Sequence, residues 1–461
     1  MDIAIVLAAG EGTRMRSKRP KVLHRICGMT LLDYVLDASI GAKIEKNIVI
    51  TGHGGEKVKK HFKDKPIIFK DQPIGEDVPY GTGFAVMQAE DMIEDDSTVV
   101  ILCGDTPLIT ADTLKKFVAY HKEGQYHGTV LTALLDEPAG YGRIKRDKKG
   151  NISKIVEDKD ASEEEKEINE INSGIFCFNG RLLKGALKKL DDNNAQNELY
   201  ITDVVEILNR EGYKIGGYII EDSIEIYGVN SRNQLAFCEK VMRERINKAH
   251  MEKGVTLIDP SATYIEPKVI IGADTTIYPG VVLEGNTSIG RDCVIRTGTR
   301  IVDSKIEDGV VVESSLIEAS KVGQGSNIGP NAHLRPDSRL GKNVKIGNFV
   351  EVKNATIGDN TKAGHLAYVG DAIVGRNVNI GCGVIFANYD GVNKHVVTVG
   401  DNAFVGSNSN LVAPLKVNDY AYIAAGSTIT KEVEKGALAI ERGTQVNKEG
   451  WVEKRGLKKN N

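Results

Sequence analysis

The chain has 461 residues, enough for two or three domains that each bury a core of their own. Its net charge is −3 with 27% charged residues, so no global basic field is available to hold nucleic acid. No apolar run approaches the ~20 residues that a membrane span needs, and the N-terminus shows no signal-peptide pattern, so no membrane partner is expected.

The number and spacing of the cysteines indicate the cellular compartment of the protein. The six cysteines are scattered and form no CxxC pair (Cys27, Cys103, Cys177, Cys238, Cys293 and Cys382). This usage is typical of a reduced protein without structural zinc, and we expect a cytoplasmic location.

Residues 1–228 alternate short β-branched runs with helical stretches. Strands are predicted for IAIVLAA, KNIVIT, PIIF and TVVILCGD, and helices for TLLDYVLDASIGA and GTGFAVMQAEDMI. This alternation favours a mostly parallel sheet with helices on both faces. Ligands of such sheets bind beyond the carboxyl ends of the strands, where the segments LAAGEG, CGD and NSG are predicted to lie.

Glycines follow the first predicted strand directly, in IVLAAGEGTRMRSKRPK (residues 5–21). The pattern is neither GxxxxGK[ST] nor a full GxGxxG. Even so, Gly10 and Gly12 would let backbone N–H groups approach a phosphate closely. Arg14 and Lys21 can then neutralise charge on a transferring phosphoryl group and on departing pyrophosphate, the alternative being that both are solvated surface charges.

The second half of the chain has a different period. Apolar residues at helical spacing, without Gly or Pro, predict one long helix over residues 231–252. After residue 269, aliphatic residues recur every six positions, in three series: Ile271, Ile277, Leu283, Ile289, Ile295 and Ile301; Ile328, Leu334, Leu340, Ile346 and Val352; and Val399, Val405, Leu411, Val417, Ile423 and Ile429. This period is typical of a parallel β-helix, in which one aliphatic side chain per repeat points inward. A β-sandwich with coincidental spacing is the alternative.

One interruption of the repeat stands out. Phe386 and Val399 are separated by thirteen positions instead of six, and the inserted NYDGVNKHVVT predicts a surface loop of the kind often found at a binding face. The domain organisation predicted from these patterns is 1–229, a linker helix over 230–252, and 253–461 with a C-terminal tail.

The segment LAAGEGTRM…PKVLH resembles the signature of sugar-1-phosphate nucleotidyltransferases, and the repeats resemble hexapeptide-repeat acyltransferases, whose β-helices are left-handed. Taken together, essentially the whole chain resembles the family of bifunctional N-acetylglucosamine-1-phosphate uridyltransferases/glucosamine-1-phosphate acetyltransferases. The resemblance implies a Rossmann-like nucleotidyltransferase domain, then a linker helix and a left-handed parallel β-helix. It also implies two reactions, in which acetyl-CoA acetylates glucosamine 1-phosphate and UTP then gives UDP-N-acetylglucosamine and pyrophosphate. Mg²⁺ and a homotrimer, with acetyl sites between neighbouring β-helices, are implied as well.

The resemblance assigns residues of a nucleotide site. Arg14 and Lys21 are expected to be catalytic, and Asp105 of CGDTPL and Asn230 of YGVNSR to hold Mg²⁺, which takes its remaining ligands from water and phosphates. A turn aspartate before Pro107 is the alternative for Asp105. The residues expected to contact UTP or the sugar nucleotide are Leu7, Ala8, Ala9, Gly10, Lys21, Gln72, Gly81, Thr82, Gly142, Glu157, Asn172 and Asn230.

The uracil contact is ambiguous among these. The family has a glutamine about five residues before the Gly-Thr pair, whereas DQPIGEDVPYGTG is about four residues longer. We assign the role to Gln72, and Glu76 is a rival.

The resemblance also assigns an acetyl-transfer site. His365 is expected on a corner or outer face as the general base, because inward β-helix positions are aliphatic and a neutral imidazole can take a proton from an ammonium. A purely structural histidine is the alternative, and spacing alone assigns it no acidic partner. Arg335 and Lys353 are expected to hold the sugar phosphate, and Tyr368 and Asn379 to orient the sugar.

The expected acetyl-CoA contacts are Cys382, Asn388, Tyr389, Ser407, Ala425 and Arg442. Cys382 stands where the family commonly has alanine. We expect it to be a buried small hydrophobe, and a covalent acetyl-cysteine is the alternative.

Two other functions are alternatives. One is a single-activity sugar-1-phosphate nucleotidyltransferase with a structural β-helix, which would need neither His365 with its cations nor the inserted loop. The other is a non-catalytic scaffold, against which Arg14, Lys21, Asp105 and Asn230 speak.

Overall fold

The computed structural model describes residues 1–75 and 78–457. The chain forms two compact units, Met1–Met242 and Arg243–Asn461. The boundary between the units lies inside helix α8 (Arg232–Met251), which occupies the place predicted for the linker helix.

A mixed sheet forms the first unit. Its strand order is β11-β7-β10-β6-β1-β4-β5, with β8 paired to β10 and β9 to β8. The strands are β1 (Asp2–Ala8), β4 (Lys46–Thr51), β5 (Ile68–Asp71), β6 (Thr98–Cys103), β7 (Gly128–Leu134), β8 (Arg143–Arg146), β9 (Ile152–Val156), β10 (Glu170–Asn179) and β11 (Ile215–Ile219). β1 pairs in parallel with both β4 and β6, whereas β10 runs antiparallel to β6 and β7. The prediction of a mostly parallel sheet is confirmed.

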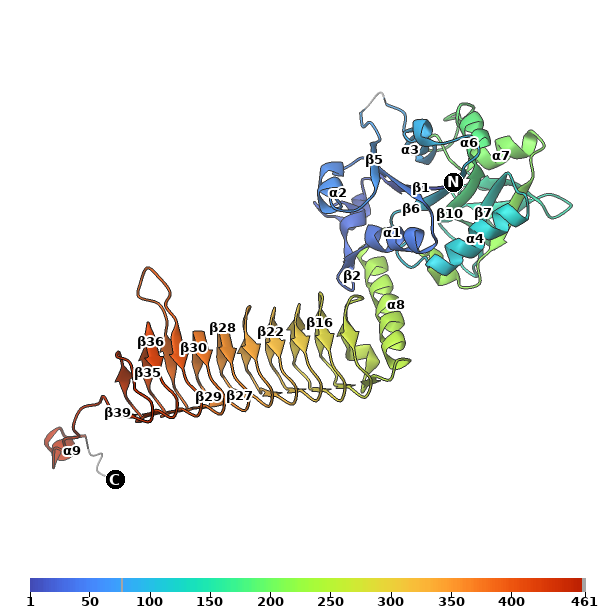
Figure 1. Ribbon diagram of the computed structural model, residues 1–461. Helices are drawn as coiled ribbons and strands as arrows, with labels where there is room; N and C mark the ends of the chain where they lie inside the picture. The colour runs from blue at the N-terminus through green and yellow to red at the C-terminus, as the bar shows by residue number, and fades with distance from the viewer. Residues whose placement is uncertain (76–77, 458–461) are drawn as a thin grey trace. The chain divides into compact units, whose positions relative to one another are not determined.

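Alternation along β1 explains why both faces of this sheet are covered. Ile3 and Ile5 belong to one hydrophobic cluster with residues of α3, α6 and α7, while Ala4 and Val6 belong to a second cluster with residues of α1 and α4. These helices surround the sheet in Figure 1. The helices of the unit are α1 (Leu31–Gly41), α2 (Gly55–His61), α3 (Thr82–Met87), α4 (Ala111–Glu123), α5 (Glu163–Lys166), α6 (Gly180–Leu187) and α7 (Asp203–Arg210).

Two local predictions for this unit need correction. The helix predicted over residues 81–93 ends at Met87 and is followed by a separate 3₁₀ turn, η3 (Glu90–Met92). The NSG segment lies inside β10 and not at a strand end. It marks an irregularity there, since the register with β7 shifts between Asn172 and Phe176 and Gly174 has φ +78°.

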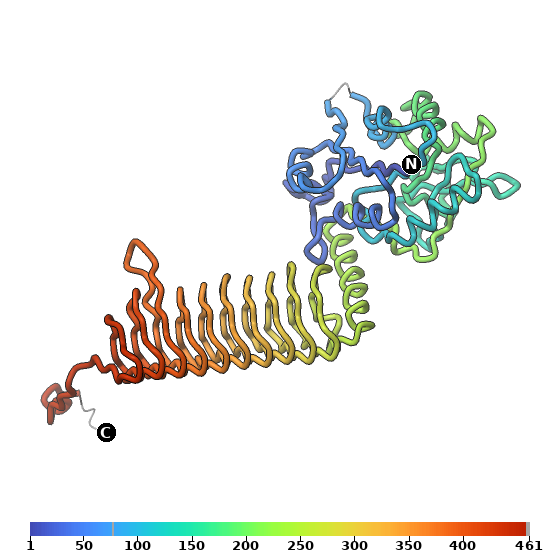
Figure 2. Tube along the Cα trace, viewed as in Figure 1, coloured from blue at the N-terminus to red at the C-terminus, as the bar shows by residue number. Residues whose placement is uncertain are grey.

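The second unit is a parallel β-helix (Figure 2). As a rule, each strand pairs with the strand three hexads further along the chain, so that Ile271, for example, pairs with Ile289. The predicted inward series are all buried in one continuous core, so the β-helix prediction is confirmed and is consistent with the left-handed coil that the resemblance implies. Between Ile301 and Ile328 the period lapses because some coils are shorter, as in the pairing of Ile301 with Ile317.

The strands of the β-helix are short, and most have two or three residues. They are β12 (Thr256–Leu257), β13 (Tyr264–Ile265), β14 (Ile270–Ile271), β15 (Thr276–Ile277), β16 (Val282–Glu284), β17 (Ser288–Ile289), β18 (Val294–Ile295), β19 (Arg300–Val302), β20 (Lys305–Ile306), β21 (Val311–Val312), β22 (Leu316–Glu318), β23 (Lys321–Val322), β24 (Asn327–Ile328), β25 (His333–Leu334), β26 (Arg339–Leu340), β27 (Lys345–Asn348), β28 (Glu351–Ile357), β29 (Lys362–His365), β30 (Tyr368–Val374), β31 (Asn379–Ile380), β32 (Ile385–Ala387), β33 (Val397–Val399), β34 (Phe404–Val405), β35 (Asn410–Val412), β36 (Leu415–Val417), β37 (Tyr422–Ile423), β38 (Thr428–Ile429) and β39 (Leu438–Ala439). A short helix, α9 (Trp451–Lys454), follows in the tail.

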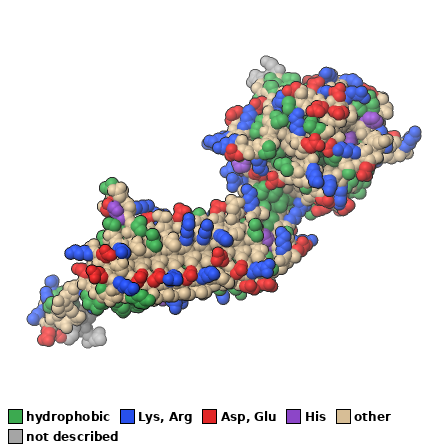
Figure 3. Space-filling model, in the orientation of Figure 1, with side chains coloured by type: hydrophobic (Ala, Val, Ile, Leu, Met, Phe, Trp, Pro, Cys, Tyr) green, Lys and Arg blue, Asp and Glu red, His purple; other side chains and the backbone are tan. Residues whose placement is uncertain are grey.

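The predicted insertion is a loop between β32 and β33, which projects from the coils near β30 and β36 (Figures 1 and 2). Hydrophobic side chains and a histidine gather on it in Figure 3. Tyr389, Val392 and Val396 of this loop are exposed. Within residues 1–75 and 78–457, no helix combines the length and the apolar character needed to cross a membrane.

Candidate active sites

The loop after β1 is shaped by two glycines with different roles. Gly12 has φ +67°, and a Cβ there would lie 2.8 Å from Cβ of Lys21, so a side chain would be both strained and crowded. A Cβ at Gly10 would meet nothing within 4 Å, which leaves the backbone open to a ligand. The two 3₁₀ turns that follow, η1 (Thr13–Met15) and η2 (Lys21–Leu23), return the chain so that Lys21 stands beside Gly12.

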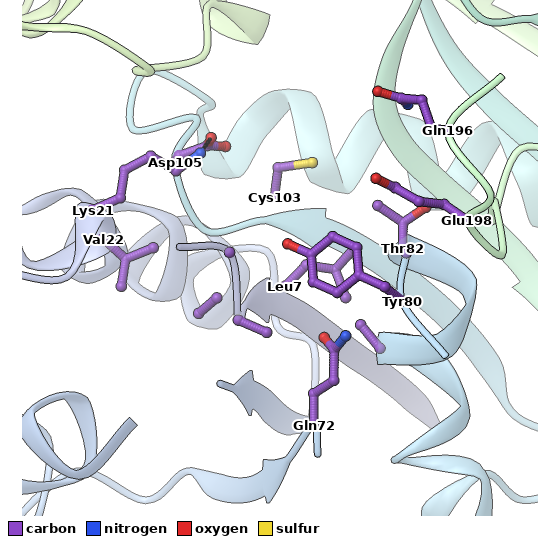
Figure 4. Close-up of a pocket in the computed structure, with 15 residues that line it drawn as sticks. Leu7, Lys21, Val22, Gln72, Tyr80, Thr82, Cys103, Asp105, Gln196 and Glu198 are labelled. Atoms are coloured by element: carbon purple, nitrogen blue, oxygen red, sulfur yellow. Dashed lines mark hydrogen bonds and ion pairs between the residues drawn. The ribbon is translucent and has the colours of Figure 1, made fainter. Parts of the chain in front are cut away.

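A cavity of about 340 Å³ opens beyond the carboxyl ends of β1 and β6 (Figure 4). It is lined by Leu7, Ala8, Ala9, Gly10, Lys21, Val22, Gln72, Tyr80, Gly81, Thr82, Ala85, Cys103, Asp105, Gln196 and Glu198. Because β4 and β6 lie on opposite sides of β1, this cavity sits at the point where the strand order reverses, the usual ligand site of such sheets. The structure therefore brings most of the residues predicted for the nucleotide to one place.

Lys21 lies between the two predicted metal ligands. Its Nζ forms an ion pair with Oδ2 of Asp105, toward which it points in Figure 4, and donates to Oδ1 of Asn230 at 3.0 Å. The side chains of Lys21 and Asp105 are only 16% and 17% exposed. A carboxylate and an amide oxygen that converge on an ammonium form a donor set that also fits a hard divalent cation.

The Gly81-Thr82 turn closes the opposite side of the cavity. Gly81 has φ +120°, and a Cβ there would lie 2.5 Å from the carbonyl oxygen of Leu199. Thr82 Oγ1 accepts from the backbone N–H of Ile201 at 3.1 Å. These contacts pack the turn against residues 198–201 and explain why Gln196 and Glu198 reach the cavity.

Gln72 is buried and lines the cavity, as its predicted uracil role requires, while its rival Glu76 lies outside the described residues. Sequence reasoning missed Tyr80, Gln196 and Glu198. Burial, Glu198 and Glu11 together raise the pKa of Tyr80. Tyr80 directly precedes the Gly-Thr pair and could have been found there, whereas no pattern marks the other two.

The three residues predicted for the sugar form a separate group. The backbone N–H of Asn172 donates to the carbonyl of Gly142 at 2.8 Å, and a Cβ on Gly142 would lie 3.4 Å from Oε2 of Glu157. Glu157 accepts from Thr202 Oγ1 at 3.2 Å, and burial raises its pKa. The structure does not bring Arg14 to the cavity lining, since its side chain is exposed on η1.

The second site follows one edge of the β-helix. Asn348 pairs with His365, Ala363 with Ile380, Ile380 with Val405 and Val405 with Ile423. The inward residues of these coils are Ala363, Ile380, Val405 and Ile423. The residues two positions after them therefore form one column, which we call the His365 column: His365, Cys382, Ser407 and Ala425. Arg442 lies next to the end of this column, because its Nη1 donates to the carbonyl oxygen of Ala425 at 2.9 Å.

His365 is exposed at the end of β29, as predicted for a corner, and its side chain has no hydrogen-bond or ion-pair partner among residues 1–75 and 78–457. Cys382 is also exposed, so the expectation that it is a buried hydrophobe is wrong. The reason is its register: it follows inward Ile380 by two positions, on the column's outer edge.

Cations gather on the neighbouring face. Leu334 pairs with Val352, so Arg335 and Lys353 are adjacent on successive coils. Arg335 Nη1 lies 2.9 Å from Oε1 of Glu351. The pKa of Lys353 is lowered by Lys394 and, to a smaller extent, by Arg335, because these positive charges lie near one another. Sequence reasoning missed Lys394, although it lies in the inserted loop that was singled out.

Tyr368 and Asn388 adjoin these cations. Asn388 is buried, and its Nδ2 lies 3.4 Å from the hydroxyl of Tyr368, while Tyr389 is exposed on the loop. Asn379 begins β31 in the 11-stranded sheet, whereas Lys353 and Tyr368 belong to strands of the 17-stranded sheet. Within one chain, therefore, Asn379 does not share a face with Lys353 and Tyr368, the residues predicted to bind the sugar phosphate together with it.

A nucleotide-sized cavity at the switch point of a parallel sheet, joined in one chain to a β-helix with a second polar site, defines a two-site transferase. A family model described as nucleotidyl transferase matches residues 3–224, and one described as GMPPB C-terminal domain matches residues 265–338 and 316–421. The protein named bifunctional protein GlmU of Alkaliphilus oremlandii is 56% identical over 458 residues, 99% of each chain. The GlmU proteins of Alkaliphilus metalliredigens and Clostridioides difficile are each 54% identical, the first over 99% of both chains and the second over 99% of this chain and 98% of its own length.

This chain belongs to the family of bifunctional GlmU proteins. The family and the bifunctional enzyme predicted from the sequence are confirmed, and the single-activity and scaffold alternatives are set aside.

Proposed function

We propose that the first unit transfers UMP from UTP to N-acetylglucosamine 1-phosphate, and that the β-helix unit acetylates glucosamine 1-phosphate with acetyl-CoA. The observation that supports the first reaction best is Lys21 held between Asp105 and Asn230 at the mouth of the switch-point cavity. The second is supported by the His365 column beside the cations Arg335, Lys353 and Lys394.

In uridylyl transfer, a phosphate oxygen of the sugar 1-phosphate attacks the α-phosphorus of UTP, and the bond to pyrophosphate breaks. Gly10 leaves room for the triphosphate, and Lys21 can leave the carboxylate to neutralise phosphate charge. Asp105 and Asn230 would hold Mg²⁺, which supplies further positive charge to the phosphates when bound. Leu7, Gln72, Gly81 and Thr82 would hold uracil and ribose, and Gly142, Glu157 and Asn172 the N-acetylglucosamine. Arg14, exposed in the free protein, is proposed to join the phosphates only when nucleotide is bound.

In acetyl transfer, the ammonium of glucosamine 1-phosphate must lose a proton before its nitrogen can attack the thioester carbonyl. The exposed imidazole of His365 would take that proton, and the C–S bond then breaks to release coenzyme A. Arg335, Lys353 and Lys394 would hold the sugar phosphate through charge-assisted hydrogen bonds, and Tyr368 and Asn379 would orient the sugar. Cys382, Asn388, Tyr389, Ser407, Ala425 and Arg442 would contact acetyl-CoA along the column and the loop.

We also propose that the active form is a homotrimer. Asn379 lies on a different face from Lys353 and Tyr368, so a neighbouring copy could complete the sugar site. Leu366, directly after His365, and Ile373, further along β30, are 57% and 55% exposed, as is usual for the surface of an interface. Both reactions would take place in the cytoplasm, where UTP and acetyl-CoA are available.

Two separate assays on one preparation test these proposals. Pyrophosphate release from UTP with N-acetylglucosamine 1-phosphate reports the first reaction, and coenzyme A thiol release with glucosamine 1-phosphate reports the second. Full thiol release by a monomer of 50.1 kDa would contradict the trimer, and the absence of either product would contradict the corresponding activity.

A further inference from the structure

The β-helix contains a corner column built only from amides. Asn343, Asn360, Asn377 and Asn402 all have positive φ, between +53° and +60°, a conformation that asparagine tolerates better than most residues. The side-chain nitrogens of the first three donate to the oxygen of the next amide, at 3.3, 3.2 and 3.1 Å. Along these four coils the corner is therefore satisfied by amides alone.

A second corner column, beside the proposed acetyl site, places a carboxylate between two amides. It contains Asn354, Asp371 and Asn388 on successive coils, and the first two have φ +44° and +45°. Nδ2 of Asn354 donates to Oδ1 of Asp371 at 2.5 Å, and Nδ2 of Asn388 donates to Oδ2 of the same carboxylate. Asp371 and Asn388 are 7% and 8% exposed, so the carboxylate is buried between two amide donors.

This carboxylate determines which way the amide of Asn388 faces. Both carboxylate oxygens of Asp371 accept hydrogen bonds from amide NH₂ groups, so Asn388 turns its NH₂ group toward Asp371. The planar amide then directs Oδ1 to the opposite side. In the all-amide column a side-chain amide can both donate to one neighbour and accept from the other. An asparagine at position 371 would likewise allow Asn388 either orientation.

The same constraint reaches Tyr368. The second hydrogen on Nδ2 of Asn388 points to the Tyr368 hydroxyl, 3.4 Å away. The hydroxyl accepts this hydrogen and keeps its own hydrogen to donate elsewhere. The buried carboxylate of Asp371 thus determines which atoms of Asn388 and Tyr368 donate hydrogen bonds and which accept them.

We propose that Asp371 is a positioning residue for acetyl transfer, which fixes Oδ1 of Asn388 as an acceptor for an N–H group of a substrate. That N–H belongs either to the ammonium of glucosamine 1-phosphate or to an amide of the coenzyme A arm. An acceptor oriented before the substrate arrives needs no reorganisation during the reaction. The inference rests on the proposed acetyltransferase function of this unit.

The test compares Asp371→Asn with Asn360→Asp in the full-length protein. Both variants exchange an acid and an amide of nearly equal size at a β-helix corner, but Asn360 belongs to the all-amide column outside the proposed site. Values of kcat/KM for acetyl transfer are measured with each substrate varied in turn, together with uridylyl transfer, oligomeric mass and Tm.

Asp371→Asn is expected to lower kcat/KM for acetyl transfer at least fivefold, with oligomeric mass and uridylyl transfer unchanged, while Asn360→Asp leaves acetyl transfer unchanged. A loss confined to experiments with varied glucosamine 1-phosphate assigns Oδ1 to the ammonium, and a loss confined to varied acetyl-CoA assigns it to the coenzyme arm. A loss below fivefold with both substrates overturns the inference. A wild-type protein without acetyl transfer would overturn the proposed function itself, and the inference with it.

A double exchange keeps the test informative if Asp371→Asn unfolds. Asp371→Asn/Asn388→Asp restores an amide–carboxylate pair in the column, so the native Tm and mass should return. The group facing the substrate is then a carboxylate in place of a neutral amide oxygen, and acetyl transfer should stay at least fivefold low. Recovery of wild-type kcat/KM in this variant would show that orientation of Asn388 is not what Asp371 provides.

Discussion

His365 allows catalysis and stability to be separated in one variant. The side chain is exposed at the end of β29 and has no hydrogen-bond or ion-pair partner in the described part of the chain. Its removal in His365→Ala should therefore change the free energy of unfolding by no more than about 0.5 kcal/mol. If His365 is the general base, acetyl transfer should fall by roughly 10²–10⁴-fold. That loss corresponds to about 2.7–5.4 kcal/mol of transition-state stabilisation, several times the expected change in stability.

The assay is thiol release under saturating substrates, with pyrophosphate release, oligomeric mass and Tm measured on the same preparation. His333→Ala is the matched control, since His333 is another β-helix histidine with Nε2 2.9 Å from Oε2 of Glu318 and no assigned role in acetyl transfer. Michaelis constants should change little in His365→Ala, because the cations and the acetyl-CoA contacts remain. A loss below fivefold, or a large loss accompanied by dissociation or a lowered Tm, would refute the reasoning.

Three further outcomes are expected in the first unit. Asp105→Ala should abolish uridylyl transfer at ordinary Mg²⁺ concentrations and leave acetyl transfer intact, as separate pyrophosphate and thiol assays would show. Gly12→Ala, which places a Cβ 2.8 Å from Cβ of Lys21 at φ +67°, should lower uridylyl transfer at least tenfold while the β-helix activity is retained. Burial, aided by Glu206, Asp191 and Asp160, raises the pKa of Asp203 to about 6, so the folded state holds this proton more tightly than the unfolded state and stability is lost as pH rises through 6. Asp203→Asn should therefore stabilise the protein above pH 6 and have little effect near pH 4, in urea unfolding at both pH values.

The β-helix could be predicted in detail because its physical constraint is periodic. Each coil needs one inward aliphatic side chain per face, so residues such as Ile277, Leu334 and Val405 record the structure directly in the sequence. The first unit was predictable at the ends of β1 and β6, where Gly10, Lys21 and Asp105 carry recognisable chemistry.

Other features depend on contacts that no local pattern encodes. Gln196 and Glu198 reach the cavity only because the chain near Leu199 packs against Gly81. Cys382 was misjudged for a related reason: a small hydrophobic residue type suggested burial, whereas the register placed it two positions beyond inward Ile380. In both cases the decisive quantity is a position in space that composition does not determine.

A strict repeat also makes its exceptions informative. The loop that follows Asn388 interrupts the six-residue period, and it begins beside the Asp371 carboxylate and the Tyr368 hydroxyl, which Asn388 contacts. Because each coil contacts only its neighbours, a solenoid can carry such an exception locally without altering the rest of the stack. The position of this exception beside polar groups is therefore itself an argument for function, and it depends on no single residue's assignment. In the α/β unit no repeat supplies such a reference, and there the argument has to rest on the cavity and the groups that converge on it.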